Sequence, residues 1–131
     1  MLVKNIKNVK AKIMSAHGGT GLIQMKFFFQ DYQRFRNDSD LGVPSPTYET
    51  ANWNFFAYAE LPIGSTIGPH KHLDNDEIYY ILEGSAEITI DNKSRHIRAG
   101  DVVLTLHGSE HSIQKVTSNL KFIATEILIN Q

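Results

Sequence analysis

The sequence contains no cysteine among its 131 residues. This absence excludes disulfide bonds, thiolate metal sites and cysteine nucleophiles, and it is compatible with a reducing compartment. A charge excess of one sign is also missing, because 13 basic residues are balanced by 14 acidic ones and the formal net charge is -1. Such a chain has no excess of positive charge of the kind with which proteins bind nucleic acid or an anionic membrane.

Long apolar runs are missing as well. No window approaches the roughly 20 apolar residues that a membrane-spanning helix needs. The first residues, MLVKNIKNVKAKIM, include lysines but no apolar stretch long enough for a signal peptide. A sustained helical period is absent, apart from one short turn expected near Asp31–Arg36. We therefore expect a single domain, residues 1–131, that is soluble and cytoplasmic and binds neither nucleic acid nor a membrane.

The chain is rich in short runs of Ile, Val, Phe, Tyr and Thr, separated by glycine and polar turns. This spacing is typical of an all-β sandwich or barrel. Hairpin turns are predicted at Glu83-Gly84-Ser85 and at Asp91-Asn92-Lys93. The expected strands are Gly21–Phe29, Trp53–Leu61, Ile67–His72, Glu77–Glu83, Ser85–Asp91, Lys93–Arg98, Asp101–Leu106, Glu110–Val116 and Lys121–Ile129.

The segment 31–52, DYQRFRNDSDLGVPSPTYETAN, differs from the rest in being polar and in carrying Pro44 and Pro46 close together. It is long for a loop inside a compact domain, and such loops are usually functional lids or surface insertions. Two interpretations stay open, a surface insertion and a lid or arm that covers a pocket or a partner subunit. Residues 1–30 would precede it as an N-terminal strand or arm.

One short stretch, GPHKHLDNDEIYYILEG, carries the residues most suited to chemistry. Side chains two apart on a strand share a face, so His70 and His72 point the same way. If the next strand pairs antiparallel with this one, Glu77 returns to the same face, and two imidazoles and a carboxylate form a facial set of metal ligands. His111, at the head of a later strand, could supply a fourth ligand. The competing interpretation is a pair of solvated imidazoles, but EIYYILEG is too apolar to be exposed on both faces.

These residues resemble the first motif of the cupin family. That motif is a glycine, five residues, H-x-H, three or four residues, a glutamate, six residues and a glycine. Gly64, His70, His72, Glu77 and Gly84 match it in full.

The second cupin motif is matched in part. Gly100, Gly108 and His111 stand at its glycine and histidine positions. Leu106 stands where proline is expected, and Lys115 where asparagine is expected. The two departures concern turn geometry and strand pairing, so they leave the ligand set in place.

The resemblance implies a double-stranded β-helix, a jelly-roll barrel. It also implies one divalent metal ion held by His70, His72, Glu77 and His111. Three imidazoles and a carboxylate suit Fe, Mn, Ni, Co or Zn. The implied function is a metal-dependent enzyme acting on a small organic substrate by dioxygenase, decarboxylase or lyase chemistry. The alternative is a non-catalytic, metal-containing module that binds a small molecule or a sugar.

Further candidates surround this set. Tyr79 shares the parity of Glu77 and is expected to point toward the same space. Its phenol could act as a catalytic acid, as a base or as a hydrogen-bond donor to substrate. The alternative is a core tyrosine whose hydroxyl is satisfied within the protein. On Trp53–Leu61 either the alanine-bearing face or the face with Phe56 and Tyr58 lines the substrate pocket, and periodicity alone leaves the choice open. His107, in a glycine turn, could approach the pocket mouth.

The remaining features concern flexibility and assembly. His17 precedes Gly18-Gly19-Thr20-Gly21, which we interpret as a flexible link because neither Lys-Ser/Thr nor a helix follows. Alternate residues of Ile23–Phe29 are apolar, so one face of this expected strand would promote aggregation if it were left exposed. The resemblance to small cupins implies a C2 homodimer, and the C-terminal strand is similarly apolar.

Overall fold

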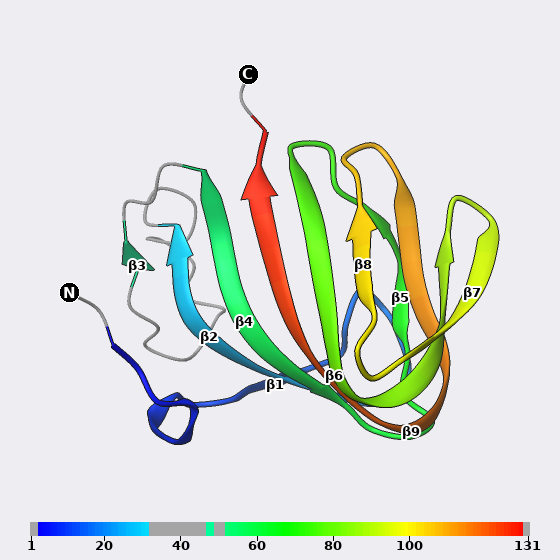
Figure 1. Ribbon diagram of the computed structural model, residues 1–131, viewed down its shortest axis with the longest axis horizontal. Coiled ribbons are helices and arrows are strands. Elements are labelled where there is room, and N and C mark those ends of the chain that lie inside the picture. Colours follow the sequence, from blue (N-terminus) through cyan, green and yellow to red (C-terminus); the bar gives the residue numbers. More distant parts are fainter. Residues whose placement is uncertain (1–2, 32–46, 49–51, 130–131) are drawn as a thin grey trace.

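The computed structural model describes residues 3–31, 47–48 and 52–129, and in this part the chain forms an antiparallel all-β fold (Figure 1). The expected fold class is therefore confirmed. No helix in the described ranges is long and apolar enough to cross a membrane. The elements are the 3-10 helix η1 (Ile6–Asn8) and strands β1 (Lys12–Met14), β2 (Ile23–Asp31), β3 (Thr47–Tyr48), β4 (Trp53–Leu61), β5 (Ile67–Lys71), β6 (Asn75–Ile90), β7 (Lys93–Arg98), β8 (Val102–Thr105) and β9 (Glu110–Leu128).

Two of these strands are much longer than predicted. The hairpin turn expected at Glu83-Gly84-Ser85 is wrong, because β6 runs through it without reversing. Its register with β9 shifts repeatedly between Ile81 and Glu87, as at a β-bulge, and Gly84 takes φ +89° there. A bulge bends a strand without ending it, and a glycine accepts the left-handed backbone that the bend requires. The two strands expected over Glu110–Val116 and Lys121–Ile129 are likewise one strand, β9.

The other predicted hairpin turn is confirmed. Ile90 pairs with Lys93, and Asp91 and Asn92 both take positive φ, as a type I′ turn requires.

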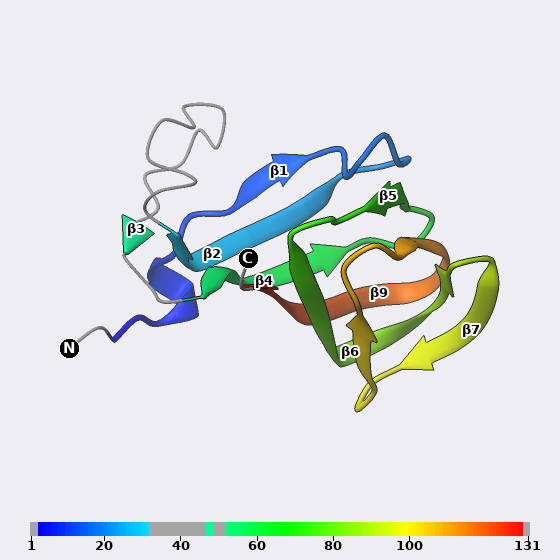
Figure 2. The same ribbon diagram turned by 90° about the horizontal axis from the view of Figure 1, so that it is seen from above.

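β6 and β9 bend together, so the hydrogen-bonded pairing between them continues through both facing halves of the fold. The N-terminal part of β6 pairs with β8 and with the C-terminal part of β9, which in turn pairs with β4. The remainder of β6 pairs with β7 and with the N-terminal part of β9, which also pairs with β5. Seen from above, β5 lies on the same side of the molecule as β1 and β2, and β7 and β8 lie on the other side (Figure 2). The space between the two halves holds the core.

The alanine-bearing face of β4 points into that core. Phe55, Ala57, Ala59 and Leu61 are buried, whereas Phe56 and Tyr58 on the opposite face are only half-buried. The small alanine side chains leave room between the halves. The buried apolar residues are Ala16, Ile23, Phe27, Phe55, Ala57, Ala59, Leu61, Ile67, Tyr79, Ile81, Ala86, Ile88, Ile97, Ile113, Val116, Leu120, Phe122 and Ala124.

The predicted lid falls mostly outside the described residues. Of segment 31–52, the structure describes the end of β2, the short strand β3 and Asn52. β3 pairs parallel with the end of β2. The helical turn expected near Asp31–Arg36 and the lid interpretation therefore remain predictions.

Substituting Gly84 tests the bend in β6. A Cβ at Gly84 would lie 2.2 Å from the carbonyl oxygen of Asn119, whereas a Cβ at Gly100, φ +93°, meets nothing within 4 Å. Both changes to alanine strain the backbone by about 1–2 kcal/mol. We expect Gly84→Ala to lower the free energy of unfolding by about 1–3 kcal/mol more than Gly100→Ala, because only the former adds a steric clash. Urea unfolding measures the difference, and equal losses would contradict the account.

Candidate metal centre

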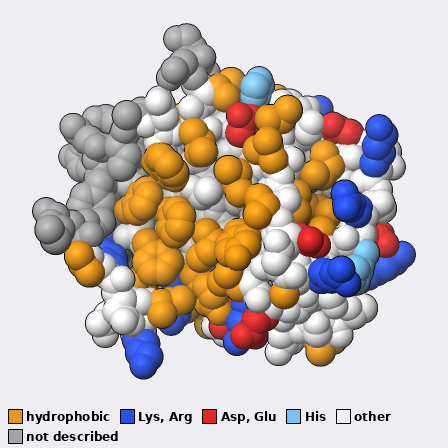
Figure 3. Space-filling view, in the orientation of Figure 1, with side chains coloured by type: hydrophobic (Ala, Val, Ile, Leu, Met, Phe, Trp, Pro, Cys, Tyr) orange, Lys and Arg blue, Asp and Glu red, His pale blue; other side chains and the backbone are white. Residues whose placement is uncertain are grey.

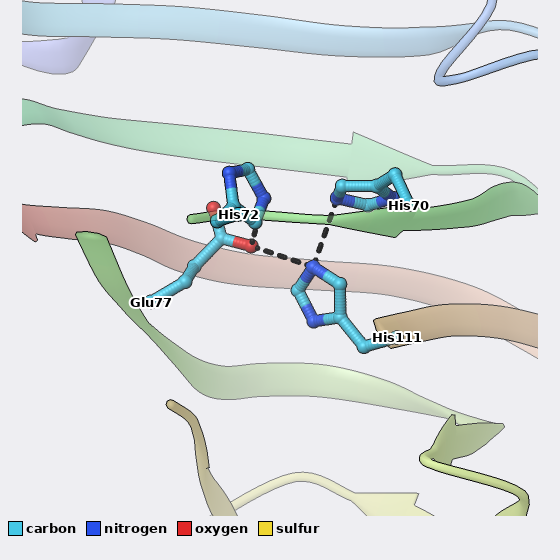
Figure 4. A group of neighbouring side chains, drawn as sticks. All are labelled: His70, His72, Glu77 and His111. Atoms are coloured by element: carbon cyan, nitrogen blue, oxygen red, sulfur yellow. Dashed lines mark hydrogen bonds and ion pairs between the residues drawn. The ribbon is translucent and has the colours of Figure 1, made fainter. Parts of the chain in front are cut away.

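Three strands, β5, β6 and β9, bring the predicted ligands together. His70 lies near the end of β5 and His72 just beyond it, while His111 begins β9 directly opposite His70. Glu77 comes from β6, which pairs with β7, β8 and β9 and not with β5. The strands of His72 and Glu77 therefore do not pair with each other, and the condition under which the sequence placed Glu77 beside the histidines is not met. The carboxylate reaches the histidines across the space between the two halves (Figure 4).

The four side chains converge on one point. One ligand atom from each of His70, His72, Glu77 and His111 lies within 4.8 Å of the others. His111 Nε2 is 2.8 Å from His70 Nε2 and 3.1 Å from Glu77 Oε1, and His72 Nε2 is 3.7 Å from the same oxygen. His72 Nε2 and Glu77 Oε1 are buried without a hydrogen-bond partner, which is costly unless something else binds them. Three nitrogens and one oxygen so placed fit a divalent metal ion.

The other nitrogen of each imidazole faces an outer partner. His70 Nδ1 donates to the Gly68 carbonyl at 2.8 Å, and His111 Nδ1 is 2.9 Å from Thr105 Oγ1. His72 Nδ1 lies 3.4 Å from Glu126 Oε1. A proton held at Nδ1 leaves the lone pair on Nε2, so these partners orient all three rings as metal ligands.

Burial sets the protonation of the centre. Burial is the main cause that lowers the pKa of His70, His72 and His111 to about 4, and neighbouring imidazoles contribute to this shift for His70 and His72. The histidines are therefore neutral near pH 7, the form that binds metal. Burial raises the pKa of Glu77 to about 7, although hydrogen bonds with Tyr79 and Glu126 oppose the rise. A metal cation beside Glu77 would compensate for the buried charge.

Tyr79 lies directly beside two of the ligands. Its ring stacks on His111 with centroids 5.5 Å apart and planes at 15°, and its hydroxyl hydrogen-bonds with Glu77. Burial, and then the Glu77 charge, raise the pKa of Tyr79 well above its ordinary value. The phenol therefore keeps its proton and can orient the Glu77 carboxylate.

His17 is a member of the site that sequence reasoning missed. Its ring stacks on His70 with centroids 3.6 Å apart and planes at 7°. The interpretation of this segment as a flexible link was wrong, because Ala16 accepts hydrogen bonds from Gly19 and Gly68. A Cβ at Gly68 would lie 2.0 Å from the His17 carbonyl oxygen, so the loop depends on that glycine. A histidine flanked by glycines was the signal, but only the fold shows which strand it meets.

Asn54 and Glu126 were also missed. The register between β4 and β9 shifts between Trp53 and Phe55, and Asn54 is only 1% exposed as a result. Its Nδ2 donates to Glu126 Oε2. Glu126 is the only acid in the apolar end of β9, and that isolation was a usable signal.

A cavity of about 500 Å³ adjoins the centre. Among the ligands, His70, His72 and Glu77 line it, and so does Tyr79. The other lining residues are Met14, Ser15, Ala16, His17, Ile23, Met25, Phe27, Asn54, Phe55, Ile67, Lys71, Phe122, Ala124 and Glu126.

The three predicted pocket residues lie elsewhere. Phe56 and Tyr58 are on the outward face of β4, where the Tyr58 hydroxyl donates to Glu60 at 2.7 Å. His107 Nδ1 lies 2.8 Å from Asp76 Oδ1, which also accepts a hydrogen bond from the His107 backbone. None of the three is among the residues that line the cavity.

Comparisons with known proteins agree with this geometry. Residues 57–126 match the family model described as Cupin domain. The chain is 32% identical over 130 residues to the oxalate-binding protein of Thermotoga maritima, covering 98% of this chain and 95% of that protein. A solved structure described as a predicted oxalate decarboxylase from Thermotoga maritima is similar with a TM-score of 0.77 and 31% identity, covering 98% of this chain and all of that one. The polyketide cyclase RemF of Streptomyces resistomycificus, at 15% identity, shares the fold with a TM-score of 0.69 over 97% of this chain and 79% of its own.

The lowered histidine pKa values predict an acid-sensitive metal-free protein. His17, His70, His72 and His111 have a pKa of about 4 when folded against 6.5 ordinarily, so between these pH values the unfolded chain binds more protons. Glu77 acts in the opposite direction, since its folded pKa of about 7 exceeds 4.5 and makes the folded state bind more protons there. The four histidines together have a larger effect than Glu77, so the free energy of unfolding should fall as the pH is lowered from 6.5 to 4.5.

Thermal unfolding of metal-free protein across this range measures the effect. His111→Gln should reduce the pH dependence, whereas His96→Gln should leave it unchanged because His96 is exposed on β7. A melting temperature that stays constant or rises on acidification would contradict the pKa assignments.

Proposed function

Because the chain belongs to the cupin domain family, we propose that it is a metal-dependent enzyme acting on a small organic substrate. One observation carries the proposal. The Nε2 atoms of His70, His72 and His111 and the Oε1 atom of Glu77 converge beside a cavity large enough for a substrate. A purely structural centre would not need that space.

These four residues would hold one divalent ion, with Fe, Mn, Ni and Zn as the candidates. When bound, the metal would supply a Lewis acid that stabilises negative charge on a substrate carboxylate, enolate or carbonyl oxygen. The protein would orient its ligands through the partners of the Nδ1 nitrogens and through the Tyr79 hydroxyl at Glu77. The apolar walls of the cavity would exclude water from the reacting group.

The reaction classes that suit this centre are dioxygenase, decarboxylase and lyase chemistry. The names of the Thermotoga maritima proteins, an oxalate-binding protein and a predicted oxalate decarboxylase, favour a substrate with a carboxylate head. The alternative function is a non-catalytic module that holds a small molecule at its metal. The word "binding" in the relative's name favours this second candidate.

Metal analysis of protein purified without a histidine tag tests the proposal. We expect about one metal ion per chain in the wild type, and little in His72→Ala, because that change removes one of the four ligands. His96→Ala is the matched control, since His96 is exposed and outside the centre. Oxygen-uptake and carbon-dioxide-release screens with small organic acids then separate turnover from binding. Wild-type metal content in His72→Ala would contradict the ligand assignment.

We also infer a C2 homodimer, which the outward face of β6 and β8 supports. Tyr80 opposes Val102 across these strands, and both are exposed, as are Leu82, Leu104 and Leu106. Figure 3 shows hydrophobic side chains gathered on one face, over the region where Figure 1 places β4, β9 and β6. Exposed apolar patches of this kind mark interaction sites. The adjacent ion pair of Glu83 and Lys121 has no net charge, so a second copy of the same face would not be repelled.

Analytical ultracentrifugation tests the dimer. Leu104→Glu should shift the protein toward the monomer, because a carboxylate would be buried in the interface. Leu22→Glu is the control, since Leu22 is similarly exposed but precedes β2 and is not on β6 or β8. A wild type that is monomeric at all concentrations would rule the dimer out.

A further inference from the structure

The cavity beside the candidate metal centre is polar around the metal ligands and apolar along its other walls. Ser15 and Lys71 are exposed at the cavity, whereas the other polar lining residues connect to the centre through a chain of contacts. His17 stacks on His70, Glu126 lies beside His72, and Asn54 donates to Glu126. The polar end is thus the metal centre and its immediate partners.

The remaining walls come mainly from the inward faces of five strands. The apolar lining residues are Met14 of β1, Ile23, Met25 and Phe27 of β2, Phe55 of β4, Ile67 of β5, and Phe122 and Ala124 of β9. Phe27 and Phe55 meet edge to face with centroids 5.4 Å apart. We name these eight residues the apolar chamber.

The structure assigns to this cavity an organic acid with an apolar body, aromatic or branched aliphatic. This assignment rests on the proposed function, since the oxygen-bearing head of the acid would lie at His70, His72, Glu77 and His111. The body would lie in the apolar chamber. Ligand sites that combine apolar walls with a few convergent polar groups bind molecules of this amphiphilic kind.

Oxalate alone does not account for the chamber. It consists of two carboxylates joined by one bond and has no apolar surface to place against Met25, Phe27 or Phe55. It would occupy only the end beside the ligands and leave most of the 500 Å³ to water against apolar walls. Burying an apolar body there would instead remove both surfaces from water, which is favourable. The extra space therefore distinguishes this chain's ligand from the one that the relative's name gives.

Binding of two 2-oxo acids with the same head tests the assignment. Phenylpyruvate and pyruvate differ by the phenyl ring, so their affinity ratio isolates the apolar body. On Mn(II)-loaded wild-type protein, titration calorimetry should show phenylpyruvate binding about 10–100-fold more tightly, the range expected for burying one aromatic ring. Equal affinities, or tighter binding of pyruvate, would overturn the assignment.

Neighbouring residues of β1 provide a matched pair of variants. Met14 lines the cavity, whereas Ile13 is 57% exposed on the opposite face of the same strand. Met14→Trp should fill part of the chamber and bring the phenylpyruvate to pyruvate ratio close to one. Ile13→Trp should keep the wild-type ratio, because the same new side chain would point to solvent. A ratio that is unchanged in Met14→Trp would place the phenyl ring elsewhere and overturn the assignment.

Oxalate binding and metal content keep this test separate from the proposed function. Both depend on the metal centre and not on the chamber, so Met14→Trp should retain both. A wild type that holds no metal would contradict the proposed metal centre itself. A wild type that holds metal and oxalate but does not distinguish phenylpyruvate from pyruvate would contradict only the apolar ligand.

Discussion

The contacts made by the three Nδ1 nitrogens decide what the candidate centre can bind. Gly68, Thr105 and Glu126 each face one of these nitrogens, and every Nε2 lone pair is left to point at the same place. Without them the rings could rotate or change tautomer, and the four ligand atoms would lose their common centre. Burial then keeps the imidazoles neutral and raises the pKa of Glu77, so a divalent cation is the group that best stabilises this arrangement.

The fold positions this centre by means of two bent strands and one close contact between backbone segments. The bends in β6 and β9 let their pairing continue through both halves, and Glu77 of β6 and His111 of β9 meet with Oε1 and Nε2 3.1 Å apart. The close approach is between Gly68 and the backbone of His17, where no larger residue fits. This contact places the His17 ring on His70, and the loop before β2 thereby forms part of the cavity wall. The bend of β6 therefore depends on Gly84, and the loop that carries His17 depends on Gly68.

The candidate ligand set could be predicted from the sequence because strand parity and the resemblance to the cupin motifs point to the same residues. Parity places His70 and His72 on one face, and the motif spacing adds Glu77 and His111. The continuity of β6 could not be predicted, since Gly84 between two apolar runs indicates a hairpin turn and a bulge equally well. Asn54 turns inward only through the irregular register of β4 and β9, and His17 meets His70 only in the folded chain. These contacts join residues far apart in sequence, and the periodicity of a sequence does not predict such contacts.

The most direct test of the centre is a crystal structure of the metal-loaded protein with anomalous scattering measured at the absorption edge of the metal. The account predicts one strong peak per chain, about 2.0–2.2 Å from the Nε2 atoms of His70, His72 and His111 and from a Glu77 carboxylate oxygen. A peak at another group of side chains, or no peak at full metal loading, would contradict it.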